Sequence, residues 1–170
     1  MEQIPCEKTG EQLALRPVEA GDAALLLTLT SLPEVGRFMR FGTQHTLAEA
    51  EALLAEYRRP ENRAWFVLDG AGRAVGVAVL KGGPEEGPPG SCGVSLFFRP
   101  ACCHKGYGYA VMQVMGGLAA RELAATRLTA HIMADNGPSR ALAEKCGFQL
   151  EETLYFDDLP GGLCVYSRPV

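Results

Sequence analysis

Apolar positions recur along this chain in two patterns, one alternating with polar residues and one spaced as on a helix face. Alternation bounded by Pro, Gly or charged residues predicts strands over residues 13–19, 64–68, 74–80, 91–98, 128–134, 148–156 and 163–168. Helical spacing predicts helices over residues 23–30, 46–59, 107–125 and 138–146. This mixture of strands and helices predicts an α/β (α+β) fold in which helices pack on a sheet.

Local signals mark where several of these elements begin and turn. Asp22 is expected to cap the helix that follows it, and Thr46 with Glu49 forms a capping box at the start of the next helix. The segment from Asp69 to Gly72 lies between two strands and predicts a hairpin turn. Residues 82–90 (GGPEEGPPG) read as a loop by composition.

The composition is that of one globular domain spanning residues 1–170. Hydrophobic residues make up 47% and charged residues 21%, which argues against disorder. The net charge of −4 gives no basic stripe for nucleic acid, and no apolar run is long enough to span a membrane. The opening residues lack the pattern of a signal peptide, so we expect a cytoplasmic protein.

The cysteines are expected to be reduced thiols, because disulfides are rare in that compartment. Cys102, Cys103 and His104 are adjacent, whereas zinc ligands are usually two to four residues apart. We therefore expect no metal site.

A glycine-rich turn before the long helix is the most informative segment. Gly106 and Gly108 let the backbone approach a ligand closely. The free N–H groups and the dipole of the helix start there would suit a pyrophosphate. The P-loop pattern is absent, and Val111 stands where a dinucleotide fingerprint needs its third glycine. A plain helix-entry turn that binds nothing is the alternative.

In this context the turn resembles the signature of the GNAT superfamily of acyltransferases, Q/R-x-x-G-x-G/A, which holds the pyrophosphate of coenzyme A. Gly106 and Gly108 match, whereas Cys103 replaces the usual Gln or Arg. The resemblance implies a single GNAT-like domain with a mixed, mostly antiparallel sheet of six to seven strands and helices on both faces. It implies that the coenzyme contacts the residues of the turn, which are Cys103, His104, Lys105, Gly106, Tyr107, Gly108, Tyr109 and Ala110. Lys105 would supply charge to the phosphates, unless it is simply a solvated loop lysine.

A second segment resembles the family's N-x-x-S/A-x-x-L-x-E-K-x-G-F pattern, from Asn136 and Ser139 to Phe148. The resemblance implies that Asn136 carries the pantetheine arm of the coenzyme. Both residues could equally cap and start a helix. Residues 13–39 are similar to the opening of the ribosomal-protein N-terminal acetyltransferases, so the likeness runs from about residue 13 to 168.

The chemistry of acyl transfer requires a neutral amine, a donor for the oxyanion and a proton for the departing thiolate. By resemblance, the backbone of Leu96, Phe97 and Phe98 would bind pantetheine and the thioester oxygen as an added strand would. Ala143 occupies the position of the family's usual tyrosine acid, so that role is vacant. The resemblance to the ribosomal-protein subgroup, which uses a serine near the coenzyme sulfur, implies Ser139 as the candidate catalytic residue. His131 is a weaker candidate for a base, because a histidine on a strand is more often structural.

The resulting expectation is an acetyl-CoA-dependent N-acetyltransferase that acts on a protein N-terminus or on a small-molecule amine, as a monomer or homodimer. The absent tyrosine and Cys103 favour an alternative, a non-catalytic acyl-CoA-binding or regulatory module of the same fold. A structural α/β domain that binds no coenzyme is a third reading. The amine acceptor cannot be read from the sequence.

Overall fold

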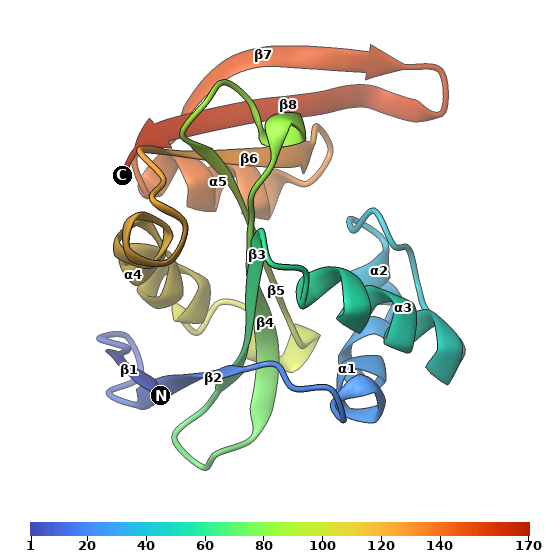
Figure 1. The fold of residues 1–170 in the computed structure, drawn as a ribbon, viewed down its shortest axis with the longest axis vertical. Helices are drawn as coiled ribbons and strands as arrows, with labels where there is room; N and C mark the ends of the chain where they lie inside the picture. Colours follow the sequence, from blue (N-terminus) through green and yellow to red (C-terminus); the bar gives the residue numbers. More distant parts are fainter. The chain divides into compact units, whose positions relative to one another are not determined.

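A computed structural model describes all 170 residues and contains eight strands and five α-helices (Figure 1). The strands are β1 (Glu2–Pro5), β2 (Gln12–Pro17), β3 (Asn62–Leu68), β4 (Ala74–Lys81), β5 (Ser91–Phe98), β6 (Arg127–Met133), β7 (Gln149–Phe156) and β8 (Leu159–Pro169). The helices are α1 (Ala23–Thr30), α2 (Pro33–Gly36), α3 (Leu47–Tyr57), α4 (Tyr107–Leu123) and α5 (Gly137–Lys145), with short 3₁₀ turns η1 (Pro84–Glu86) and η2 (Pro100–Cys102).

The chain forms two compact units. The first comprises Met1–Val79 and Leu96–Val111, and the second comprises Leu80–Ser95 and Met112–Val170. Strands β4 and β5 and helix α4 therefore contribute residues to both units.

The first unit is built on the antiparallel strands β1, β2 and β3, with β4 next in order. Helices α1, α2 and α3 gather on one side of these strands (Figure 1). Leu26 and Leu29 of α1, Leu54 of α3 and Phe66 of β3 lie in one buried cluster with Val77 of β4. Burying such side chains stabilises the fold by about 1.5–3 kcal/mol each.

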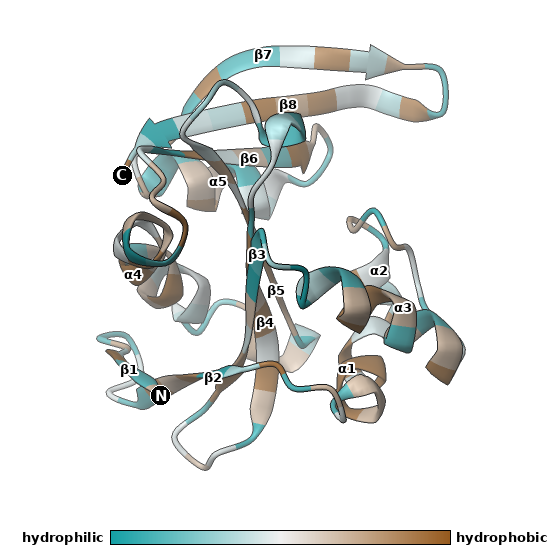
Figure 2. Ribbon diagram, viewed as in Figure 1, coloured by the Kyte–Doolittle hydropathy of each residue, from teal (hydrophilic) through white to brown (hydrophobic).

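The second unit has the strand order β5-β6-β8-β7. Strand β5 runs parallel to β6, and β6, β8 and β7 pair in antiparallel fashion. The outermost strand, β7, is exposed along most of its length, and its ribbon alternates between teal and brown residues (Figure 2). Tyr166 of β8 and Leu128 of β6 are fully buried and form part of this unit's core.

The structure confirms the seven expected strands and four expected helices, with small shifts at their ends. The expected six to seven strands were too few, because β1 was missed. Strand β1 has four residues, ends at Pro5 and buries only Ile4, so it is too short to show alternation. Helix α2, a single turn, was also missed.

Three of the four local signals behave as expected, and residues 82–90 form the loop between β4 and β5, which includes η1. The hydroxyl of Thr46 accepts a hydrogen bond from the Glu49 N–H at 3.2 Å, although the Glu49 carboxylate contacts that hydroxyl rather than an N–H group. The prediction for Asp22 was wrong. Its carboxylate makes no helix-cap hydrogen bond and instead accepts from Arg16 and from the Glu19 N–H.

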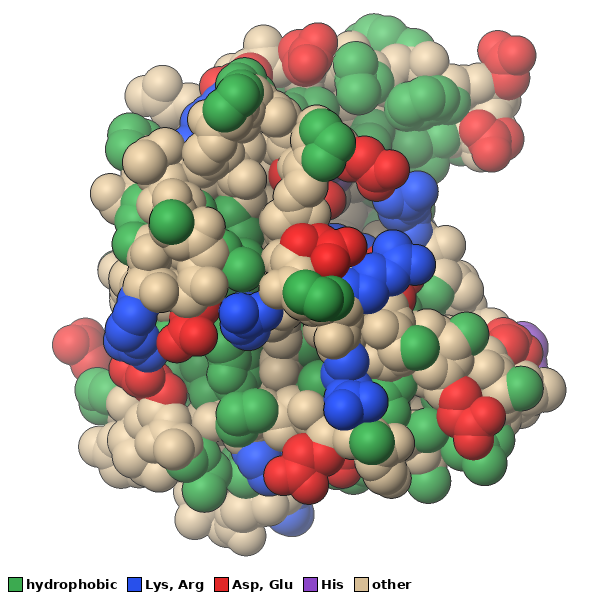
Figure 3. All heavy atoms as spheres, viewed as in Figure 1, with side chains coloured by type: hydrophobic (Ala, Val, Ile, Leu, Met, Phe, Trp, Pro, Cys, Tyr) green, Lys and Arg blue, Asp and Glu red, His purple; other side chains and the backbone are tan.

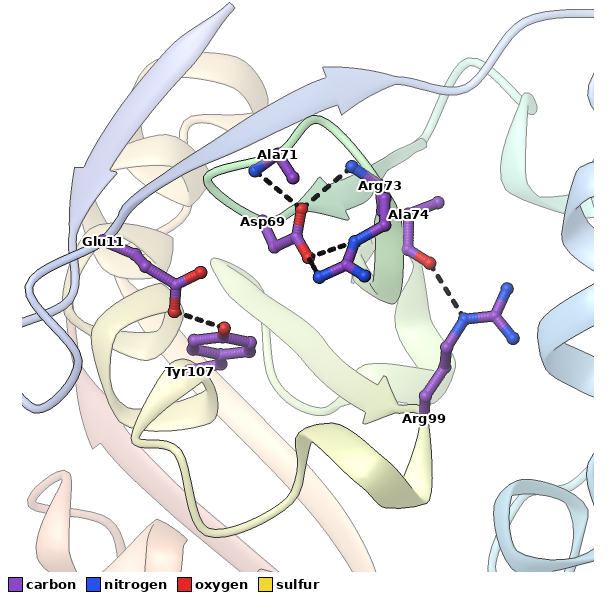
Figure 4. Close-up of polar contacts among 7 residues, drawn as sticks. All are labelled: Glu11, Asp69, Ala71, Arg73, Ala74, Arg99 and Tyr107. Carbon is purple, nitrogen blue, oxygen red and sulfur yellow. Dashed lines mark hydrogen bonds and ion pairs between the residues drawn. The ribbon is translucent and has the colours of Figure 1, made fainter.

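The predicted hairpin turn between β3 and β4 is organised by the buried carboxylate of Asp69. It accepts from the N–H groups of Ala71 and Arg73, at 2.9 and 3.0 Å, and from the Arg73 side chain at 2.9 Å (Figure 4). Burial alone would raise the pKa of Asp69, but the hydrogen bonds from Arg73 and Ala71 outweigh it and hold the pKa below its ordinary value.

Charged side chains of both signs are interspersed on the face drawn in Figure 3. None of the helices combines the length and the apolar character that crossing a bilayer would require.

Candidate functional site

The glycine-rich turn lies in the first unit, between η2 and the start of α4. His104 has φ +63° and Gly106 has φ +84°, so the backbone is left-handed at two points within three residues. Glycine adopts this conformation without strain. The N–H of Ala110 donates to the Gly106 carbonyl at 3.0 Å, as in any first helical turn. The N–H groups of Gly106, Tyr107 and Gly108 have no acceptor in this unit, and they can therefore bind an anion.

The turn is braced by the connection between β1 and β2. Cys6 donates its S–H to the Lys105 carbonyl at 3.4 Å, and the Lys8 ammonium donates to the His104 carbonyl at 2.5 Å. A Cβ atom added to Gly106 would lie 3.0 Å from the Lys8 Cβ. Gly106 is thus required both for its backbone conformation and for close contact with the N-terminal hairpin.

A second contact from the hairpin fixes the first residue of α4. The Tyr107 hydroxyl donates to the Glu11 carboxylate at 2.5 Å (Figure 4), and the tyrosine is buried. This hydrogen bond is the main reason that the pKa of Glu11 is lowered, with a smaller contribution from Thr9. Burial, followed by the same hydrogen bond, raises the pKa of Tyr107.

Side chains of positive charge accompany the turn. Lys105 is part of the turn, and its ammonium lies 5.8 Å from the centre of the Tyr107 ring. Lys8, from the connection between β1 and β2, donates to the His104 carbonyl of the turn. Cys103, at the position where the family signature has Gln or Arg, is exposed, and its thiol contacts the Arg99 carbonyl at 3.8 Å. Desolvation, and then the neighbouring Cys102, raise the pKa of this thiol, which disfavours the thiolate form.

The end of β5 leads directly into the turn. Phe97 is 6% exposed and packs edge-on against Phe41, with ring centres 5.6 Å apart. Phe98 points the other way, toward Tyr107, with ring centres 6.3 Å apart. A Cβ atom on Gly76 of β4 would lie 2.5 Å from the Phe97 carbonyl, so glycine permits this close approach of the strands. Phe97 is therefore the core residue of the pair, and Phe98, like Leu96, is only half-buried.

Strands β5 and β6 separate within the second unit. Their parallel ladder contains only Ser91, Cys92 and Gly93 of β5, paired with residues 127–129 of β6. Strand β6 stays paired with β8 as far as Met133, but it is paired with β5 only as far as Thr129. A parted pair of parallel strands presents backbone N–H and C=O groups to which an extended ligand can add.

Asn136 and Ser139 also lie in the second unit, at the start of α5. The Asn136 side chain caps the helix, because its oxygen accepts from the Ser139 N–H at 3.3 Å. The structural reading of this pair is confirmed, and their contact with a coenzyme stays a prediction. The Ser139 side chain is half-buried.

The sequence showed no tyrosine at position 143, but the structure places Tyr166 of β8 beside α5. Its hydroxyl accepts from Arg140 at 3.0 Å and donates to Glu144 at 3.1 Å. Tyr166 is completely buried, and its hydroxyl is already engaged by two residues of α5. It therefore holds α5 in place and is a poor proton donor to a ligand.

The predicted site residues thus fall into two groups. The residues of β5 and the turn, Leu96 to Phe98 and Cys103 to Ala110, lie together in the first unit. Asn136, Ser139 and His131 lie in the second unit, where the structure adds Glu86, whose carboxylate is 4.0 Å from the His131 ring. Sequence reasoning missed Glu86, and its only signal was an acidic pair in a loop of Gly and Pro.

Comparison with known proteins assigns this arrangement to a family. A family model described as an acetyltransferase (GNAT) domain matches residues 12–149. A search of curated protein sequences finds no match.

Three solved structures illustrate the shared fold. A spermidine N-acetyltransferase from Vibrio cholerae, in complex with CoA and spermine, superposes with a TM-score of 0.77 at 19% identity, over 92% of this chain and 95% of that chain. An aminoglycoside acetyltransferase in complex with coenzyme A gives 0.76 at 18% identity, over 92% and 94%. The ribosomal L7/L12 α-N-protein acetyltransferase RimL, also with coenzyme A, gives 0.77 at 16% identity, over 99% and 98%.

At such identities the superpositions establish the fold only, whereas the family model covers most of the sequence. The chain belongs to the acetyltransferase (GNAT) domain family.

Proposed function

We propose that this protein transfers the acetyl group of acetyl-CoA to a primary amine, and that residues 1–170 act as one catalytic domain. The observation that carries the proposal is that the N–H groups of Gly106, Tyr107 and Gly108, at the start of a helix in a GNAT domain, have no backbone acceptor within the first unit. Such N–H groups bind a diphosphate without any particular side chain.

In this proposal the coenzyme is held mainly by backbone. The turn from Cys103 to Ala110 receives the diphosphate, with Lys105 beside it, and the end of β5, from Leu96 to Phe98, receives the pantetheine arm by strand-like pairing. Asn136 contacts the same arm. The loss of Gln or Arg at position 103 removes one side-chain contact but leaves these N–H groups intact.

The transfer itself begins with attack of the neutral amine nitrogen on the thioester carbonyl carbon. As the C–S bond breaks, the departing thiolate must gain a proton. We propose that the Ser139 hydroxyl supplies it and takes in exchange the proton that the attacking nitrogen loses. Ser139 is the candidate because the chain has no tyrosine at position 143 and the Tyr166 hydroxyl is engaged elsewhere. The N–H of Ser139 donates to the Asn136 side chain that caps α5, which leaves the Ser139 hydroxyl for this task.

The acceptor is proposed to be a primary amine, as in the structural neighbours named for spermidine, aminoglycosides and a protein N-terminus. The protein would work in the cytoplasm, where acetyl-CoA is available, as a monomer or a homodimer.

Two measurements test the proposal in sequence. Calorimetric titration with coenzyme A should show binding at a single site per chain, and an absence of heat would reject it. Release of free thiol from acetyl-CoA should then rise when spermidine, kanamycin or a peptide with a free N-terminus is added. Binding without thiol release by any of these amines would favour the non-catalytic acyl-CoA-binding module.

A further inference from the structure

The loop between β4 and β5 places an acidic side chain on the face of the second unit's sheet. The Thr129 hydroxyl of β6 donates to the Glu86 carbonyl at 3.0 Å, which fixes the end of η1 against the strand. The Glu86 side chain is only 15% exposed. A Cβ atom added to Gly93 of β5 would lie 2.0 Å from a Glu86 carboxylate oxygen. The carboxylate therefore occupies the space that any side chain at position 93 would fill.

His131 lies on the same face as this carboxylate. Gly93 pairs with Thr129, and His131 is two residues further along β6, so alternation directs Thr129 and His131 to one side of the sheet. The Nδ1 atom of His131 is 4.0 Å from the nearer Glu86 oxygen, which is the reach of an ion pair once the ring is protonated. The ring is 35% exposed, so its other nitrogen can meet a solute.

Glu86 and His131 lie close to the point where strands β5 and β6 stop pairing. The ladder between β5 and β6 ends at Gly93 and Thr129, and His131 is the second residue of β6 beyond that point. Glu86 and His131 thus flank the beginning of the gap between the strands. The sheet there offers a carboxylate and an imidazole near each other where the β5–β6 ladder ends.

Other charged groups on this face are occupied or more distant. Burial, and then the charge of Glu86, raise the pKa of the Cys92 thiol to about 11, so that thiol stays neutral. Arg127 is paired with Glu151 at the other end of β6. Glu152 of β7 aligns with Val165 of β8, which in turn aligns with His131, so it stands two strands away. Glu86 is the acidic group nearest to the ring.

We propose that Glu86 and His131 receive the ammonium group of the acceptor amine and remove its proton, an inference that rests on the proposed acetyl transfer. The ammonium donates to His131, whose imidazole takes one proton, and Glu86 stabilises the resulting imidazolium. The neutral amine then attacks the thioester carbon, the C–S bond breaks, and the second amine proton reaches the leaving sulfur through the Ser139 hydroxyl. Water later takes the proton from His131.

This pair also defines the class of acceptor. A largely buried carboxylate attracts a cationic primary amine and repels a substrate whose reactive end carries a carboxylate or phosphate nearby. Polyamines, amino sugars and N-terminal peptides without an acidic second residue satisfy this requirement. A peptide with Asp or Glu beside its N-terminal amine should be a poorer substrate.

Replacement of each member of the pair tests the inference. His131→Gln keeps hydrogen-bonding capacity but cannot accept a proton, and it should lower kcat/KM for the best amine of the panel by roughly 100-fold. Glu86→Gln should lower it by roughly tenfold, because the imidazolium loses its counter-charge. Gly93→Ala should reproduce the loss seen with Glu86→Gln, since the added methyl group displaces the carboxylate. Coenzyme A affinity should be unchanged in all three variants.

Matched controls are His45→Gln and Glu85→Gln, which alter exposed side chains of the same types. In the wild-type protein kcat/KM should fall toward acidic pH, because the proposed base must be unprotonated. His131→Gln should abolish this fall, whereas a merely structural substitution would leave it in place. Full turnover by His131→Gln and Glu86→Gln, with coenzyme bound normally, would overturn this inference alone. Failure of the wild-type protein to bind coenzyme A or to acetylate any amine would overturn the proposed function together with it.

Discussion

The glycine turn of the first unit and the β5–β6 face of the second unit present different kinds of group to a ligand. The turn from Cys103 to Gly108 presents backbone N–H groups, and its neighbours serve to hold that backbone in place. The β5–β6 face presents side chains, and there the backbone serves to make room for them, as Gly93 does for Glu86. Glycine is essential in both regions, in one for conformation and in the other for space.

This difference explains why one region can tolerate substitutions that the other cannot. A backbone site is expected to lose little when a neighbouring side chain changes, so the proposed coenzyme site should tolerate Cys103. A side-chain site fails when a single functional group is removed, even if the fold is intact. Substitutions in the turn should therefore change coenzyme affinity, whereas substitutions on the β5–β6 face should change turnover.

The largest effect is expected from Gly108→Val in the turn. A branched side chain on the first turn of α4 would project over the N–H groups that bind the diphosphate, so coenzyme A affinity should fall by at least about 100-fold. Isothermal titration calorimetry measures this directly. Gly117→Val, in the same helix at a position with open space around it, should bind the coenzyme as the wild type does. Equal affinity in both variants would place the diphosphate elsewhere.

A smaller effect, confined to turnover, is expected from Ser139→Ala. Because Asn136 caps α5 through the Ser139 N–H and not through its hydroxyl, the helix should remain intact. Loss of a proton donor to the leaving thiolate should lower kcat by roughly tenfold to 100-fold with coenzyme affinity unchanged. Steady-state kinetics with saturating acetyl-CoA provide the measurement. Ser31→Ala, an exposed serine of the first unit, is the control, and an unaltered kcat in Ser139→Ala would end the hydroxyl's catalytic role.

The contrast between the two regions also decides how much could be predicted from the sequence. The turn was predictable, because its left-handed backbone and its close contact with Lys8 require a glycine at position 106, directly before the long helix. The helix α5 and its Asn136 cap were predictable for a similar local reason. Glu86 and His131 are 45 residues apart and meet only through a loop and the register of two strands, and no local pattern records that meeting.

The N-terminal hairpin was unpredictable for the same reason. Strand β1 is too short to alternate, and its turn acts on residues nearly 100 positions away: the Glu11 to Tyr107 separation is 96. Nothing in the segment from Cys6 to Glu11 indicates that it supports a glycine turn. Contacts between distant segments depend on the three-dimensional fold, which a linear pattern of residue types does not contain.

The smallest expected effect comes from loosening that support with Tyr107→Phe. The substitution keeps the buried ring but removes the hydrogen bond to Glu11, so the turn should become less rigid and coenzyme A affinity should fall by about two- to fivefold. Amine KM should not change, because the β5–β6 face is untouched. Tyr155→Phe, which removes an exposed hydroxyl from β7, is the matched control.

The same contact gives a pH dependence of known sign. The pKa of Glu11 is lowered in the folded protein, chiefly by the hydrogen bond from Tyr107, so the contact stabilises the fold fully above the ordinary pKa of glutamate and is lost as the pH falls through the lowered value. The melting temperature of the wild type should therefore exceed that of Tyr107→Phe near neutral pH, and the difference should shrink as the pH falls below the ordinary pKa of glutamate. Glu11→Gln keeps a hydrogen-bond acceptor but has no charge to titrate, so its difference from Tyr107→Phe should stay constant over that range. A gap between wild type and Tyr107→Phe that does not change with pH would mean that the Glu11 carboxylate does not support the turn.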